Sequence, residues 1–200
     1  MVEFRSALNG RWVPGRFGAA GSGPPLKFSE IPLETLFQIS GWPDSFASNA
    51  RQALSVLGLE SIGTVGSAQT AGPYTTFRIA PERIIVRTAD ADALSRMARE
   101  IESDNLPLLD LSHARAVTRI QGLTAPEFLK RLVSIDLDPR AFTPASFALT
   151  EIHTVPVMLH RMADDSNIPC FELYVPYTWA ASLWDLIRDT ASPFGYEVVE

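Results

Sequence analysis

The sequence VPYTWAASLWDLI at residues 175–187 repeats the apolar spacing of VRTADADALSRMA at residues 86–98. In both stretches a valine is followed by apolar residues 8, 11 and 12 positions later. These residues are Val86, Leu94, Met97 and Ala98 in one stretch and Val175, Leu183, Leu186 and Ile187 in the other. The spacing is typical of a strand that leads into a helix with one apolar face. Its recurrence predicts that the chain holds two related halves.

A second pair of positions supports the repeat. Ile39 and Gly41 recur as Ile120 and Gly122, and each pair ends a strand-like run that precedes a helix-like one. The element order in each half is then strand, helix, two or three strands and a helix, with a last strand at 196–199. We therefore predict an α+β fold of two ferredoxin-like βαββαβ-type halves, about 31–104 and 105–200, inside one globular unit of residues 31–200.

Local patterns place the elements within each half. In the first half we expect a strand from Thr35, a helix from Pro43 to Gly58, strands at 74–79 and 83–88, and a helix from Leu94 to Ile101. In the second half we expect a strand that opens at Leu108 and reaches Gly122, strands at 147–150, 155–162 and 171–175, and a helix at 177–190. The T-x-x-E pattern from Thr124 to Glu127 predicts a capping box at the helix between them.

Residues 1–30 differ from the rest of the chain. Five of the 12 glycines fall between Gly10 and Gly23, and the apolar residues Trp12 and Phe17 stand among them. Glycine interrupts any regular period, so this segment cannot build a core of its own. We expect an extended N-terminal arm that lies over the body or over another subunit, with an arm that is disordered in the isolated chain as the alternative.

Composition excludes several classes of protein. The net charge is −6 and no block of basic residues occurs, which argues against a nucleic-acid partner. No stretch approaches the 18 consecutive apolar residues of a membrane span, and the N-terminus lacks the pattern of a signal peptide. The single cysteine, Cys170, rules out a disulfide within the chain, and we expect it to be buried. The cytoplasm is the expected location.

The residues that could carry chemistry do not form a recognisable site. Asp110, Ser112 and His113 are the residue types of a hydrolase triad, but neighbours in a strand point to opposite faces and triads come from separated segments. The histidines His113, His153 and His160 show no metal-ligand spacing. We therefore predict no catalytic, cofactor-binding or metal-binding residue in this chain.

Three aromatic residues are the candidates for contact with a partner. Trp179, Leu183, Leu186 and Ile187 share one face of the expected last helix, and we expect this face to lie in the core. Trp184 lies off the centre of that face. Tryptophan is enriched at the energetic centres of interfaces. Trp184, together with Trp12 and Phe17 of the arm, is the predicted partner-contact set.

Residues 105–190 resemble a known family. LDLSHARAVTRIQG at 109–122, FLKRLVSIDLDPRAF at 128–142 and the stretch from Tyr174 to Trp184 are similar to the gamma subunit of heterotetrameric sarcosine oxidase. The D-L-S-H element at 110–113 also resembles the wider aminomethyltransferase group, which includes the glycine cleavage T protein. That group has a doubled folate-binding fold, in agreement with the repeat.

The resemblance implies a function in a larger assembly. It implies a cytoplasmic heterotetramer of alpha, beta, gamma and delta chains that demethylates sarcosine oxidatively. FAD, FMN, NAD, tetrahydrofolate and zinc would be held by the other subunits, and this chain would be a non-catalytic subunit that packs on the large alpha subunit.

Three other functions remain open at this point. The resemblance also fits the equivalent small subunit of N-methylglutamate dehydrogenase. The D-L-S-H element alone would fit a small folate-binding one-carbon transfer protein. A free-standing regulatory module, with a metabolite between two sheets, is the third.

Overall fold

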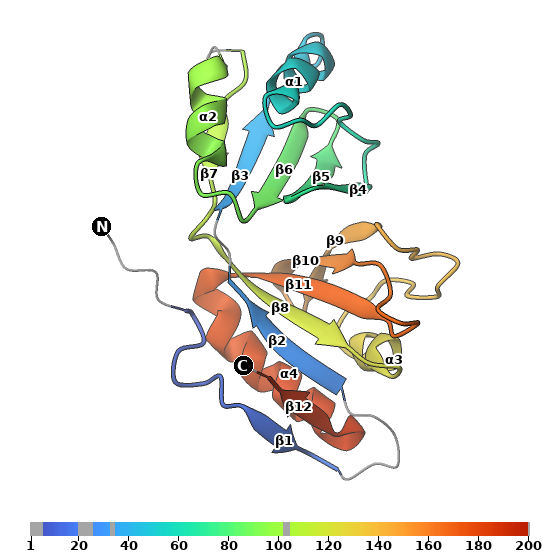
Figure 1. The fold of residues 1–200 in the computed structure, drawn as a ribbon. Helices are drawn as coiled ribbons and strands as arrows, with labels where there is room; N and C mark the ends of the chain where they lie inside the picture. The colour runs from blue at the N-terminus through green and yellow to red at the C-terminus, as the bar shows by residue number, and fades with distance from the viewer. Residues whose placement is uncertain (1–5, 20–25, 33–34, 102–104, 200) are drawn as a thin grey trace. The chain divides into compact units, whose positions relative to one another are not determined.

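The computed structural model describes residues 6–19, 26–32, 35–101 and 105–199, which fall into two compact units. The first unit comprises residues 33–114 and the second comprises residues 1–32 with 115–200. Figure 1 shows that each unit combines one sheet with helices. The predicted halves divide at residue 105, whereas the units divide between Ala114 and Arg115.

The first unit contains a five-stranded antiparallel sheet in the order β4-β5-β6-β3-β7. Its elements are β3 (Thr35–Ser40), α1 (Phe46–Ser55), β4 (Ala68–Ala71), β5 (Tyr74–Ala80), β6 (Arg83–Thr88), α2 (Ala93–Glu100) and β7 (Leu108–Asp110). Strands β5, β6, β3 and β7 with the two helices are a ferredoxin-like βαββαβ unit, and β4 extends it at one edge. Its core includes Phe37, Ile39, Ile84, Val86, Phe46, Ala50 and Met97.

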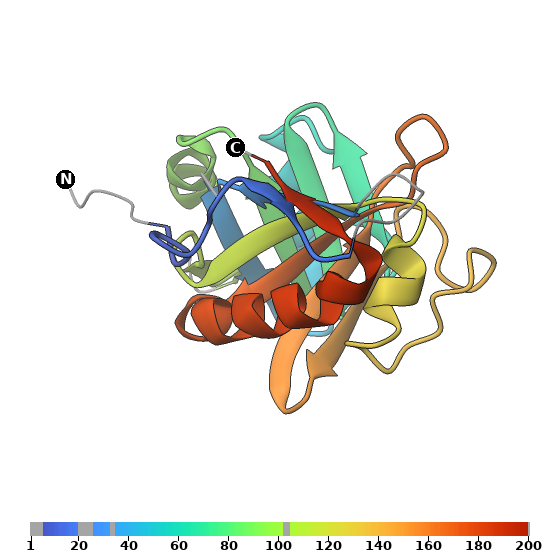
Figure 2. The same ribbon diagram turned by 90° about the horizontal axis from the view of Figure 1, so that it is seen from below.

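The second unit contains a seven-stranded sheet in the order β1-β12-β2-β8-β11-β10-β9. Its strands are β1 (Gly15–Phe17), β2 (Leu26–Ile31), β8 (Arg115–Gln121), β9 (Phe147–Ile152), β10 (Val155–Arg161), β11 (Cys170–Pro176) and β12 (Tyr196–Val198). Its helices are α3 (Ala125–Leu129) and α4 (Ala180–Ala191), with 3₁₀ turns at Tyr177–Trp179 and Ser192–Phe194. Figure 2 shows α4 running across one face of this sheet.

The strand orders confirm the predicted repeat. When β1 and β2 are set aside, the second sheet reads β9-β10-β11-β8-β12, which corresponds strand for strand to β4-β5-β6-β3-β7. The matched residues occupy matched places, because Val86 and Val175 lie in β6 and β11 and the following residues lie in α2 and α4. The burial of the matched helix residues differs, most of all in the last pair, in which Ala98 is exposed and Ile187 is buried. The spacing therefore marks the same elements in both units but not the same buried face at every position.

Part of the predicted arm is an interior strand. Residues 26–31 form β2, which lies between β8 and β12 and pairs antiparallel with β8 and parallel with β12. Leu26 and Phe28 are buried and Lys27 between them is exposed, so this segment alternates as a half-buried strand does. The glycine-rich composition of residues 10–23 concealed that alternation. Residues 1–5 and 20–25 of the predicted arm lie outside the described residues.

The strand predicted from Leu108 to Gly122 is two strands in two sheets. β7 pairs with β3 in the first unit, and β8 begins only at Arg115 in the second. The interruption comes from Asp110, whose carboxylate accepts a hydrogen bond from the backbone N–H of Ser112 at 2.9 Å. Such a side-chain-to-backbone bond two residues on makes a turn, which the apolar spacing of the run did not show.

Two predictions for individual side chains were wrong. The side chain of Thr124 makes no capping hydrogen bond, and the Glu127 carboxylate instead pairs with Lys130 at 2.7 Å. Trp179 lies in the 3₁₀ turn before α4 and is exposed, whereas Trp184 is buried in the core with Leu183 and Ile187. The 3.6-residue period that we extended back to Trp179 applies only to the α-helix itself.

A polar cluster fixes the start of α2. Tyr74 donates a hydrogen bond to the Asp90 carboxylate at 2.8 Å, and Arg96 of α2 is bonded to both. The Arg96 guanidinium, with the Tyr74 hydroxyl as the second cause, holds the pKa of Asp90 at about 2, below its usual value of 3.8. The cluster therefore joins β5, the end of β6 and the helix that follows.

This cluster predicts a pH dependence. Because the pKa of Asp90 is lowered on folding, its contribution to stability is present above about pH 4 and is lost as the pH falls towards about 2. Replacing Arg96 by glutamine should move the carboxyl titration midpoint of Asp90 up towards 3.8, as measured by NMR. Arg99→Gln is the matched control, because Arg99 lies on the same helix and donates to the backbone carbonyl of Ser95 at 3.2 Å. An unchanged midpoint in the Arg96 variant would contradict this assignment.

Candidate functional site

The three predicted partner-contact residues lie in the second unit, where they hold the N-terminal segment to α4 and β12. Trp12 stacks on Trp184 with 4.5 Å between ring centroids, and Phe28 meets the same indole edge-on at 5.5 Å. Phe17 stacks on Tyr196 of β12 at 5.4 Å. These five side chains form an aromatic cluster, and pairs of this geometry stabilise beyond the area that they bury.

Hydrogen bonds fix the position of both indoles. The Trp12 indole N–H donates to the carbonyl of Val199 at 2.8 Å, and the Trp184 indole N–H donates to the carbonyl of Arg11 at 3.2 Å. Arg11 also forms an ion pair with Asp185 of α4. Trp184 is only 2% exposed, while Trp12 and Phe17 are half-buried. Contact of these residues with another subunit stays a prediction.

Two other tryptophans are much more exposed. Trp42, in the loop between β3 and α1, is 67% exposed, and Trp179, before α4, is 50% exposed. Sequence reasoning assigned Trp179 to the core and did not single out Trp42. The position of Trp42 between Gly41 and Pro43 indicates a loop rather than a helix face, and that signal could have found it. Large exposed aromatic rings are the features that interfaces use as anchors.

A buried polar cluster lies on the sheet of the second unit. Glu172 of β11 is fully buried, and one of its oxygens accepts a hydrogen bond from the guanidinium of Arg119 in β8 at 2.8 Å. The other oxygen accepts from the Tyr174 hydroxyl at 3.0 Å and lies 3.7 Å from Nδ1 of His160 in β10. Register explains the meeting, because His160, Glu172 and Arg119 are directly opposite one another on three adjacent strands.

A buried carboxylate with these neighbours is satisfied inside the chain. Both of its oxygens are bonded, one to a cation and one to a phenol, which offsets much of the cost of burying its charge. The sequence of β11 carries a signal for the buried acid, though not for its partners on β8 and β10. The sequence CFELYV at 170–175 places an acid on a strand that is otherwise apolar or aromatic.

Asp110 ends β7, and Ser112 and His113 lie in the turn that follows it. Asp110 bonds to the backbone of Ser112, and that bond is the largest cause of the lowered pKa of Asp110. The Ser112 hydroxyl accepts a hydrogen bond from the backbone N–H of Leu36 at 3.2 Å. The D-L-S-H element therefore ties the end of β7 to the start of β3.

The structure also shows where Cys170 and His153 lie. Cys170 is buried at the start of β11, and burial raises its pKa to about 11, so the thiol stays protonated at neutral pH. His153 occupies the β9–β10 hairpin, with a φ of 54°. Within the part of the chain that the structure describes, no three potential metal ligands come together. In the same part, no helix is long and apolar enough to span a membrane.

These features define a class of protein. Five strands in the same order and two helices recur in the two units, which makes the chain a duplicated ferredoxin-like α+β protein. The model of the GCVT N-terminal domain matches residues 67–199. The chain belongs to the GCVT N-terminal domain family.

Individual relatives agree with this family. The chain is 30% identical over 95 residues to the gamma subunit of sarcosine oxidase from Corynebacterium sp. (strain P-1), across 48% of this chain and 43% of that protein. It is 25% identical over 166 residues to the gamma subunit from Arthrobacter sp., across 82% of this chain and 81% of that protein.

Solved structures show the same fold. A chain of the heterotetrameric sarcosine oxidase from Corynebacterium sp. U-96, solved with pyrrole 2-carboxylate, matches with a TM-score of 0.76 and 20% identity over 88% of both chains. The glycine cleavage system aminomethyltransferase T from Bartonella henselae matches with a TM-score of 0.63 and 14% identity, over 90% of this chain and 55% of that one. The predicted aminomethyltransferase-like fold is confirmed.

Proposed function

We propose that this chain is the gamma-type subunit of a heterotetrameric sarcosine oxidase. The observation that carries the proposal is the similarity to a sarcosine oxidase gamma subunit over 82% of this chain. The alpha subunit is the main partner, and beta and delta subunits complete the assembly in the cytoplasm. FAD, FMN, NAD, tetrahydrofolate and zinc reside on those other chains.

The hydrogen bonds of three carboxylates support a role in which this chain binds a partner subunit and does not itself catalyse the reaction. Glu172, Asp110 and Asp90 each accept hydrogen bonds from neighbours in their own unit. Catalysis needs side chains placed to exchange protons or electrons with a substrate. These carboxylates instead hold strands and a helix together, which fits a subunit that supports the chemistry of its neighbours.

The exposed Trp179 is the residue that we expect at the interface. It stands before α4, in the same unit as Trp12 and Phe17. Trp179→Ala should weaken binding of the purified chain to the alpha subunit of the same organism at least tenfold in calorimetry, because anchors of this type contribute about 2 kcal/mol or more. Val65→Ala, at an exposed residue of the first unit, is the control. Wild-type affinity in the Trp179 variant would refute this assignment.

A folate-binding one-carbon protein is the second candidate, and the likeness to aminomethyltransferase T favours it. The described residues do not fit it well. A buried carboxylate could bind the amino group of a pterin, but both oxygens of Glu172 are already bonded to Arg119 and Tyr174. We expect no quenching of tryptophan fluorescence by micromolar tetrahydrofolate in the isolated chain. Saturable quenching would favour the second candidate.

The substrate preference of the assembly distinguishes a sarcosine oxidase from the remaining alternative, N-methylglutamate dehydrogenase. The equivalent subunit of N-methylglutamate dehydrogenase would have the same fold, so this chain alone does not distinguish the two. The complex reconstituted with this chain should oxidise sarcosine in preference to N-methylglutamate, measured as formaldehyde release. The opposite preference would assign the chain to the dehydrogenase.

A further inference from the structure

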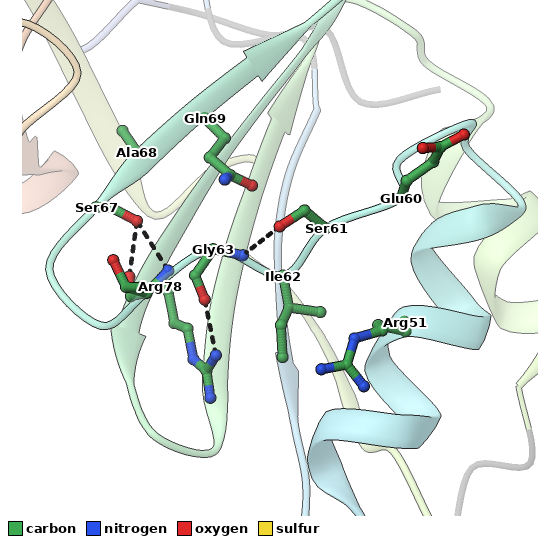
Figure 3. Close-up of a pocket in the computed structure, with 10 residues that line it drawn as sticks. Arg51, Glu60, Ser61, Ile62, Gly63, Ser67, Ala68, Gln69 and Arg78 are labelled. Atoms are coloured by element: carbon green, nitrogen blue, oxygen red, sulfur yellow. Dashed lines mark hydrogen bonds between the residues drawn. The ribbon is translucent and has the colours of Figure 1, made fainter.

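A pocket of about 460 Å³ opens in the first unit and is independent of every feature used above. Figure 3 shows it between α1, the segment at residues 60–67 and the strands β4 and β5. Ligand pockets for small molecules occupy about 300–1,000 Å³, so the volume suits a metabolite-sized ligand. Its lining combines a hydrogen-bonded polar wall, the cation of Arg51 and two buried apolar side chains.

The polar wall is held in place by side-chain bonds to the backbone. Arg78 of β5 donates to the carbonyl of Gly63 at 2.8 Å and to that of Pro81 at 2.9 Å, so it ties the wall to the β5–β6 turn. The Ser67 hydroxyl accepts from the N–H of Thr64 at 3.1 Å and donates to the Thr64 carbonyl at 2.7 Å. A wall bonded in this way needs little ordering when a ligand binds.

Gly63 brings this wall close to its neighbours. Its φ is +65°, and a Cβ there would stand 3.0 Å from the Ser67 hydroxyl and 3.3 Å from the carboxamide carbon of Gln69. Both residues line the pocket. A larger residue at position 63 would therefore be strained and would displace lining side chains.

Arg51 supplies an exposed cation at the pocket. Figure 3 shows its guanidinium directed from α1 towards Ile62. Within the described residues, it has no hydrogen-bond or ion-pair partner, whereas Arg78 is bonded to two carbonyls. Arg51 and Arg78 outnumber the one acid of the lining, Glu60, in a chain whose net charge is −6. The residues that line the pocket thus carry a net positive charge, although the protein as a whole is acidic.

Two apolar side chains also line the pocket. Ile62 and Ala68 are buried and line it beside the polar wall. A ligand with a charged end and a short carbon chain can therefore place the charge at Arg51 and the carbon atoms over Ile62. Guanidinium groups bind carboxylates and phosphates through paired hydrogen bonds.

We propose that this pocket binds a small molecule that carries a carboxylate or phosphate group, with Arg51 as the residue that holds the charge. Arg78 is a positioning residue that fixes the wall. The proposal does not depend on the subunit assignment, because it concerns only residues of the first unit.

Calorimetry on the full chain tests the proposal with two probes, succinate and inorganic phosphate, at constant ionic strength. Saturable 1:1 binding of succinate would assign the carboxylate class, and binding of phosphate the phosphate class. Arg51→Gln should weaken binding at least tenfold. Arg83→Gln, at an exposed arginine on the adjacent hairpin, should leave binding within twofold of wild type.

A spectroscopic readout locates the binding. The backbone amide signals of Gly63 and Ser67 should shift in ¹⁵N–¹H spectra as the probe is added, and circular dichroism should show that each variant is folded. The proposal is overturned if neither probe binds saturably, if the Arg51 variant binds as wild type does, or if the shifts fall elsewhere.

Discussion

Replacing Trp184 by alanine is expected to lower the free energy of unfolding of the second unit by about 3–5 kcal/mol. The indole is almost fully buried, stacks on Trp12, meets Phe28 edge-on, and donates to the carbonyl of Arg11. Its removal leaves a cavity and also frees the N-terminal segment that it holds. Urea denaturation followed by circular dichroism measures the effect.

Trp179→Ala is the matched control for this substitution. The same residue type is removed five positions earlier, but Trp179 is half exposed, and we expect a loss below about 1 kcal/mol. Equal losses in the two variants would contradict the burial of Trp184 in its own chain. The two variants therefore also distinguish Trp184, which stabilises the fold, from Trp179, which is proposed to bind the partner.

Replacing Arg119 by methionine is also expected to have a large effect, lowering the free energy of unfolding by about 3–5 kcal/mol. The substitution leaves the carboxylate of Glu172 fully buried without its cationic partner. Burial makes an uncompensated charge costly, while the methionine still covers the sheet. The free energy of unfolding from urea denaturation at pH 7 is the measurement.

A double substitution tests whether the pair acts as a unit. Arg119→Met combined with Glu172→Gln removes both charges, and the amide oxygen can still accept from Tyr174. We expect the double variant to be more stable than Arg119→Met alone, which a double-mutant cycle measures as coupling between the two sites. Additive losses would show that the two side chains stabilise the sheet independently.

Much of the fold could be predicted because the repeat lies in apolar positions. Val86 and Val175 mark equivalent strands, and Ile39 and Ile120 are the next-to-last residues of β3 and β8, which are equivalent strands. Burial of one face of a strand or helix fixes such positions, so their spacing survives in the sequence. The position of β2 could not be predicted in this way, because pairing of an N-terminal strand between β8 and β12 depends on contacts far apart in the chain.

The places where sequence reasoning failed have local causes. The turn at Asp110 depends on a side-chain bond to the backbone, and the exposure of Trp179 depends on a 3₁₀ turn, and neither changes the apolar pattern. The cluster around Glu172 requires the register of three strands, which no single segment contains. The pocket at Arg51 gathers residues 51–78 through loop geometry and has no sequence signature.

The central claim is that this chain acts by covering a larger neighbour and that the reacting groups belong to other subunits. Purification of the protein from its native cells, under conditions that preserve complexes, tests it most directly. We expect the chain to elute with a larger flavin-containing polypeptide and with sarcosine-oxidising activity. Elution of the chain alone, or turnover of sarcosine by the isolated chain, would contradict the account.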